Sequence, residues 1–266
     1  ALLQGNVAAD EIGGVLEALL PAVHPTTAPA EVPPLAVAPL PHGPGSCVLV
    51  RRSGTNTEER NGAVVLTLQA SQETLPAVTL CELVSQVLSQ RCFDELRTKQ
   101  QLGYIVALQP YVDSSMDSGF CGIKVIVQSE KHPAEVHRRI DAWLAGELAS
   151  LSSEMTDEQL EEYVQALLAL KREKPKKLGD EFGQNWGEVR ARTFRFSRRE
   201  ETIAFLERPL AELLREFRAF VSEKLVPAPR LAVEVLGGEA AKRAAAACAP
   251  QEAAGAGDAG PEAEKP

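Results

Sequence analysis

A long apolar helix face that ends abruptly in a strand constrains the fold of this chain more than any other feature. Apolar residues recur at steps of three and four, the pattern of a buried helix face, at Leu80, Leu83, Val84, Val87, Leu88, Cys92, Phe93 and Leu96. Arg97 and Lys99 follow in the last turn, where cations favour the negative end of the helix dipole. Gly103 can take a positive φ and end the helix, after which residues 104–108 form a short apolar strand. The sequence therefore predicts a buried helix that turns sharply into a strand, with Arg97 and Tyr104 on either side of the turn.

The segments around this helix predict a sheet. Short β-branched runs at residues 47–52 and 63–69 precede the helix, which is expected from about Leu75 to Gln100. Strands are expected again at residues 103–110 and 119–128, and in the second of these alternate side chains share one face. After Ser129 the apolar period becomes helical, and residues 231–236 end the pattern as a strand. This order predicts an α+β fold in which a layer of helices packs on a sheet.

The helices expected after Ser129 carry recognisable start signals. Pro133 opens the first at its first-turn position, and Thr156 with Gln159 forms a capping box at the start of the second. A third helix has an apolar stripe at Leu178, Phe182, Trp186 and Val189, and Pro209 starts another. Trp143 and Trp186 both fall on apolar stripes, so both are expected in the core.

Composition divides the chain into four parts. Residues 1–20 contain a strand end and a helix from about Ala8 to Leu20 with an apolar stripe, and residues 21–45 form a proline-rich linker. A complete domain is expected at residues 46–236. Residues 237–266 are rich in Ala, Gly and Glu without an aromatic residue, which is typical of a disordered tail. The helix in residues 1–20 has an apolar face that would lack a partner within this chain.

Charge and cysteine content exclude several classes of function. A formal net charge of −9 argues against nucleic acid as a partner, and no apolar run approaches 18 residues, which argues against a membrane span. The five cysteines are widely spaced without a C-x-x-C pair, so neither a disulfide framework nor a cysteine zinc site is indicated. Three of them lie in apolar runs and are expected to be reduced core residues. These features predict a reducing, cytoplasmic location.

Several motifs resemble one family of peptidases. Residues 92–104 (CFDELRTKQQLGY) resemble the C-terminal lobe of the insulysin/nardilysin branch of the pitrilysin zinc metalloendopeptidases. Residues 125–131 (VIVQSEK), 174–178 (KPKKL) and 185–189 (NWGEV) match the same family in the same order. The resemblance covers about residues 1–236. It implies the pitrilysin-like α/β roll, a mostly antiparallel sheet covered by a layer of helices and preceded by the tail of a previous unit.

The family's catalytic zinc motif is missing from this sequence. The family holds zinc with H-x-x-E-H and a distant glutamate, and no such motif occurs among the residues of the chain. The nearest candidate, His132 with His137, is one residue too long, because five residues of helix turn about 500° and leave the second ring about 140° from the first. We expect both to be surface histidines. The chain is therefore expected to contain no metal ligands, to bind no cofactor and to be inactive as a peptidase on its own.

The resemblance assigns this lobe a role in handling substrate. In the family, the arginine and tyrosine that match Arg97 and Tyr104 reach across to the zinc-bearing half and hydrogen-bond the substrate at the scissile carbonyl. The implied partners are a zinc-bearing N-terminal half of the same protein and peptide substrates, and the resemblance also admits a homodimer. The alternative is a non-catalytic peptide-binding or scaffold paralogue of the same superfamily.

A basic window at residues 171–200 leaves two interpretations open. Its lysines and arginines can be solvated charges on helix faces, which is the usual role of such runs. They can also form a positive wall that attracts acidic residues or the carboxyl ends of peptides.

Overall fold

The structure is a computed structural model that describes residues 2–23, 37–41, 43, 46–56, 58–114 and 119–238. Most of the predicted linker and almost all of the predicted tail at 237–266 lie outside the described residues. No helix in the described part of the chain is long and apolar enough to cross a membrane.

A five-stranded sheet forms the centre of the fold, in the order β1-β5-β2-β4-β3. Its strands are β1 (Cys47–Ser53), β2 (Gly62–Gln72), β3 (Ile105–Asp113), β4 (Phe120–Ser129) and β5 (Arg230–Leu236). Only β1 and β5 pair in parallel, and the other neighbours are antiparallel. The predicted fold class, a mostly antiparallel sheet with helices, is confirmed.

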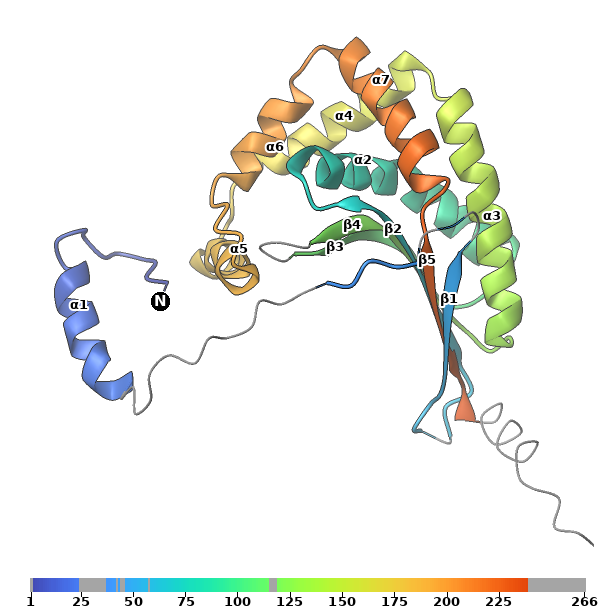
Figure 1. Cartoon of the computed structure of the whole chain (residues 1–266), viewed down its shortest axis with the longest axis horizontal. Coiled ribbons are helices and arrows are strands. Elements are labelled where there is room, and N and C mark those ends of the chain that lie inside the picture. Colours follow the sequence, from blue (N-terminus) through green and yellow to red (C-terminus); the bar gives the residue numbers. More distant parts are fainter. Residues whose placement is uncertain are drawn as a thin grey trace, which may run out of the picture.

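Most of the described helices lie together on one face of the sheet (Figure 1). They are α2 (Leu75–Cys92), α3 (Pro133–Ser153), α4 (Asp157–Arg172), α6 (Arg198–Leu206) and α7 (Leu210–Phe220), with a π-helical turn η3 (Val221–Leu225) after α7. The predicted start of α4 is confirmed, because Thr156 and Gln159 form a reciprocal capping box. The core lies between this helical layer and the sheet, where Leu66, Leu88 and Ile123 are fully buried.

Within the described residues, no such layer of helices covers the opposite face of the sheet (Figure 1). Five apolar residues stand in register across it, one from each strand, and all of them are only half-buried: Val50, Val233, Val65, Ile126 and Ala107. An antiparallel sheet can leave one face toward solvent, but that face is then usually polar. This row is therefore an apolar strip, flanked on the same face by polar residues such as Lys124 and Gln128, that a further part of the protein or a ligand could contact.

Two helices contribute no buried residue: α1 (Ile12–Leu19), which is followed by the short turn η1 (Leu20–Val23), and α5 (Leu178–Ala191). The expectation that Trp186 is a core residue is wrong, because its side chain is 44% exposed and stacks on Phe182 with ring centroids 6.1 Å apart. Trp143 on α3 is buried as expected. An apolar stripe shows which side of a helix can be buried, and the presence of a neighbour decides whether it is.

Candidate functional site

The helix-to-strand turn predicted between Arg97 and Tyr104 is built from a widened helix end. Directly after α2 the backbone continues as a π-helical turn, η2 (Phe93–Lys99), in which the Gln100 N–H donates to the Glu95 carbonyl at 2.9 Å. The helix then ends at Gln101, whose φ of 50° lies in the left-handed region. Leu96 is fully buried, so the inner side of the turn is anchored in the core.

Gly103 is required at the turn for a reason other than the predicted one. Its φ is not positive, since Gln101 takes the left-handed conformation instead. A Cβ at Gly103 would collide with the backbone carbonyl of Gln128 on β4. Ser129 secures the same approach by donating its hydroxyl hydrogen to the Leu102 carbonyl. The prediction of a positive φ at Gly103 is therefore wrong, and the close packing of the turn on β4 explains the glycine.

Arg97 and Tyr104 do come together at this turn. The guanidinium carbon of Arg97 lies 4.7 Å from the centroid of the Tyr104 ring, a cation–π geometry. Tyr104 precedes the first residue of β3 and is 82% exposed, so it is not a core residue. Within the described residues, neither side chain has a hydrogen bond or an ion pair. The turn therefore holds a cationic donor and a phenol together at the surface.

A pocket of about 410 Å³ lies beside Tyr104. Its lining comes from the turn, from the end of β4 and from one loop residue: Asn61, Gln101, Leu102, Gly103, Tyr104, Ser129, Glu130 and Lys131. Most of these positions fall in the two motifs at residues 92–104 and 125–131. The fold thus brings the two motifs together around one hollow.

Phe93 belongs to this site although the sequence pattern places it on the buried helix face. Its side chain is 37% exposed, and its ring centroid also lies 4.7 Å from the Arg97 guanidinium carbon. The signal that could have found it is the spacing, because side chains four residues apart on a helix are neighbours. Arg97 thus contacts two aromatic rings, those of Phe93 and Tyr104.

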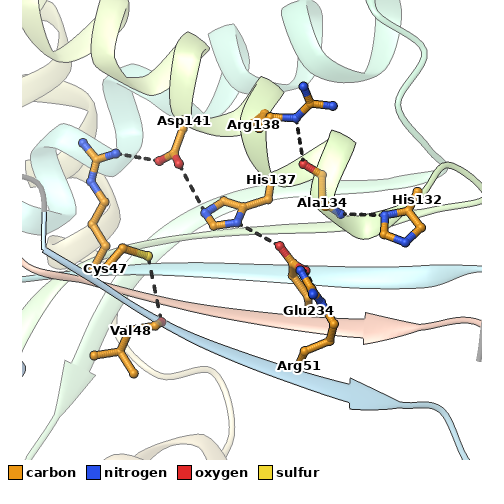
Figure 2. Close-up of polar contacts among 10 residues, drawn as sticks. Cys47, Val48, Arg51, His132, Ala134, His137, Arg138, Asp141 and Glu234 are labelled. Carbon is orange, nitrogen blue, oxygen red and sulfur yellow. Dashed lines mark hydrogen bonds and ion pairs between the residues drawn. The ribbon is translucent and has the colours of Figure 1, made fainter. Parts of the chain in front are cut away.

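His137 also lies elsewhere than its sequence predicts (Figure 2). Its side chain is only 13% exposed, so the expectation of a surface histidine is wrong. Nδ1 lies 3.0 Å from Glu234 on β5 and Nε2 lies 3.2 Å from Asp141 one turn along α3. His132 is exposed as expected, and its ring accepts a hydrogen bond from the Ala134 N–H at the start of α3.

This histidine cluster is a set of ion pairs. Arg51 on β1 donates to Glu234 at 2.7 Å, and Arg230 donates to Asp141 at 2.6 Å. Burial alone would raise the pKa of Glu234, but its hydrogen bonds with Arg51 and His137 outweigh burial and hold the pKa below its usual range. Among the described residues, no group of three or more His, Cys, Asp and Glu side chains is arranged to hold a metal ion. These residues therefore do not fit the family's zinc.

Three cysteines lie in the core as predicted: Cys81, Cys92 and Cys121 are buried and free, whereas Cys47 is exposed. Burial raises the pKa of Cys92 to about 12. A thiol with so high a pKa is a poor nucleophile, so Cys92 offers no catalytic group to the neighbouring turn.

The basic window at 171–200 divides into paired and unpaired charges. Lys171 pairs with Glu82 at 2.7 Å, and Arg198 lies between Glu188 and Glu73 at 2.5 and 3.0 Å. In contrast, Arg190 has no acidic partner within the described ranges and lines the cavity of about 520 Å³ between α5 and the end of β3. Lys171 and Arg198 thus agree with charges paired on helix faces, whereas Arg190 agrees with a positive wall.

Comparisons with known protein sequences point to one family. The family model described as PQQ synthase PqqF-like, C-terminal lobe domain 4, matches residues 83–186. The insulin-degrading enzyme of Drosophila melanogaster is 37% identical over 169 residues, which cover 63% of this chain and 17% of that protein. Nardilysin of Homo sapiens is 31% identical over 210 residues, covering 77% and 18% respectively. The chain thus spans less than a fifth of the length of these relatives.

Solved structures show the same fold. The crystal structure of pitrilysin matches with a TM-score of 0.56 at 20% identity, over 74% of this chain and 20% of that one. A peptidase M16 inactive domain from Pseudomonas fluorescens matches with a TM-score of 0.59 at 14% identity, over 88% of this chain and 52% of that one. By sequence and by fold, this chain is homologous to the C-terminal lobe of the pitrilysin (M16) peptidases.

Proposed function

We propose that this chain is the non-zinc, C-terminal part of an insulysin-like metalloendopeptidase. In this proposal it encloses peptide substrates and contacts them at the scissile bond, and an N-terminal half outside this chain holds the zinc. The observation that carries the proposal is the pair Arg97 and Tyr104, which meet at the surface beside a hollow and have no polar partner among the described residues. Because neither side chain is engaged in a hydrogen bond or ion pair within the described residues, the guanidinium and the phenol can both donate to a ligand.

The chemistry proposed for the pair is stabilisation of developing charge. A guanidinium and a phenol aimed at the scissile carbonyl act as preorganised hydrogen-bond donors, and the loss of one such donor typically lowers the rate by about 10²–10³-fold. The uncovered apolar face of the sheet would provide an inner wall for the enclosed peptide. A cytoplasmic location belongs to the same proposal and is supported by the free, buried cysteines.

The test is peptide cleavage by a full-length protein in which an H-x-x-E-H half precedes this chain. Tyr104→Phe keeps the ring on Arg97 but removes the hydroxyl, so we expect kcat to fall about 10²-fold. Tyr163→Phe on α4, whose ring packs against the core, is the matched control and should cleave normally. If Tyr104→Phe cleaves at the rate of the control, the proposed contact is wrong.

The alternative function is a non-catalytic peptide-binding or scaffold lobe, which the absence of the zinc motif from this sequence favours. The same full-length protein can distinguish the catalytic from the non-catalytic function. A lobe of this kind would bind a fluorescent peptide without cleaving it at saturating zinc, and Tyr104→Phe would change only the Kd.

A further inference from the structure

Arg97 makes cation–π contacts with two aromatic rings of different character. Both ring centroids lie 4.7 Å from its guanidinium carbon, Phe93 from one turn earlier and Tyr104 from beyond the turn. Tyr104 has a hydroxyl group that can itself meet a substrate. Phe93 has no polar atom in its side chain, so any contribution it makes to a polar contact must pass through Arg97.

The contacts with the two rings leave the N–H donors of Arg97 without a hydrogen-bond partner among the described residues. An aromatic ring that stacks on the flat face of a guanidinium does not occupy its five N–H donors, which lie in the plane of the group. An exposed arginine without a carboxylate partner samples many rotamers, and it loses this conformational entropy when it binds a ligand. Stacking restricts those rotamers without consuming a donor.

The backbone supports this arrangement. Phe93 and Arg97 lie in the same π-helical turn, whose inner residue Leu96 is buried and accepts a hydrogen bond from the Leu102 N–H at 2.9 Å. The Phe93 ring is 37% exposed, although burial would be the usual outcome for a phenylalanine on an apolar helix face. Its position is therefore better explained by what it contacts than by core packing.

We propose that Phe93 is a positioning residue that fixes the orientation of Arg97 for the substrate. This inference rests on the proposed function of Arg97. It predicts that the aromatic character of residue 93, rather than its volume, controls how well Arg97 acts.

The experiment compares Phe93→Leu, which keeps apolar volume, with Phe93→Trp, which keeps an aromatic face. In the full-length protein with its zinc half, we expect Phe93→Leu to lower kcat about tenfold with KM changed less than about twofold, because the donor is misplaced rather than lost. Phe93→Trp should restore kcat to within about threefold of the original, since tryptophan is the strongest cation–π partner. Phe205→Leu is the control, because Phe205 stacks on Arg208 at the same 4.7 Å within the helical layer.

A second measurement separates this inference from the proposed function. In the 266-residue chain alone, the Arg97 Nε–Hε order parameter measured by NMR should fall in Phe93→Leu and recover in Phe93→Trp. If it is equally low in the unmodified chain, Phe93 does not position Arg97 and the inference is overturned. If the order parameter behaves as expected but Arg97→Ala and Tyr104→Phe both cleave normally, the proposed function is wrong, and the inference that Phe93 orients Arg97 is still supported. If Arg97→Ala loses cleavage while Phe93→Leu keeps it, only the inference is overturned.

Discussion

At Gly103 the turn that leads into β3 approaches β4 so closely that the carbonyl group of Gln128 occupies the place where a side chain would begin. The same turn contains Gln101 in a left-handed conformation and the Ser129 hydroxyl bonded to the Leu102 carbonyl. Single residues thus set the distance between the end of η2 and β4, and with it the position of Tyr104. The proposed site depends on this backbone packing as much as on its own side chains.

Replacing Gly103 with alanine should therefore destabilise the protein. We expect a loss of about 1–3 kcal/mol in the free energy of unfolding, because a backbone carbonyl cannot move aside as a side chain can. Gly183→Ala on α5 is the control, since no atom lies within 4 Å of the added Cβ. In a helix that change should stabilise by about 0.5–1 kcal/mol. Urea denaturation measures both, and a Gly103→Ala protein as stable as the original would contradict the packing argument.

Among the elements, α3 and α5 show how differently two similar patterns can be used. Each carries a tryptophan on an apolar stripe, yet Trp143 is 8% exposed and Trp186 is 44% exposed. The difference lies in the neighbours, because α3 packs on β2, β4 and β5 in the helical layer. A hydrogen bond from α5 to the N-terminal segment is made by the Asn185 side-chain amide, which donates to the Gln4 side-chain oxygen at 3.3 Å.

The two tryptophans should consequently differ in their contribution to stability. Trp143→Ala should cost about 3–5 kcal/mol, as is typical for removing a large aromatic side chain from a core. Trp186→Ala should change the free energy of unfolding by less than about 1 kcal/mol, because little buried surface is lost. Denaturant titration followed by circular dichroism compares them without relying on tryptophan fluorescence. Equal costs would mean that α5 is packed against the rest of this chain in solution.

Across the whole molecule, one charged network joins the two ends of the described domain. Glu234 on the last strand is 1% exposed and bonds Arg51 on the first strand and His137 on α3. Asp141 extends the network to Arg230. These contacts tie together segments almost two hundred residues apart, and they replace the surface position that the sequence analysis assigned to His137.

The network makes stability depend on pH in a definite direction. The pKa of Glu234 is lower in the folded state, so the folded protein binds fewer protons and Glu234 contributes stability above the unfolded pKa. That contribution should be lost as the pH falls from about 5 through the folded pKa. We expect Glu234→Gln to cost about 1–3 kcal/mol at pH 7, because Arg51 is partly solvated, and to flatten the acid limb of the stability curve. Glu161→Gln, exposed on α4, should leave that limb unchanged, and an unchanged limb in Glu234→Gln would refute the assignment.

Local patterns were enough to predict the α+β class, the order of strands and helices, the capping box at Thr156 and the position of Arg97 and Tyr104 on either side of a turn. Periodicity and cap chemistry act over a few residues, which is why they can be followed along the chain. Only the tertiary structure decided which apolar stripes are covered, that Phe93 faces Arg97 rather than the core, that His137 is enclosed by carboxylates, and why position 103 must be glycine. Each of these depends on an atom contributed by a segment distant in sequence, or on the absence of one, and no local pattern contains that information.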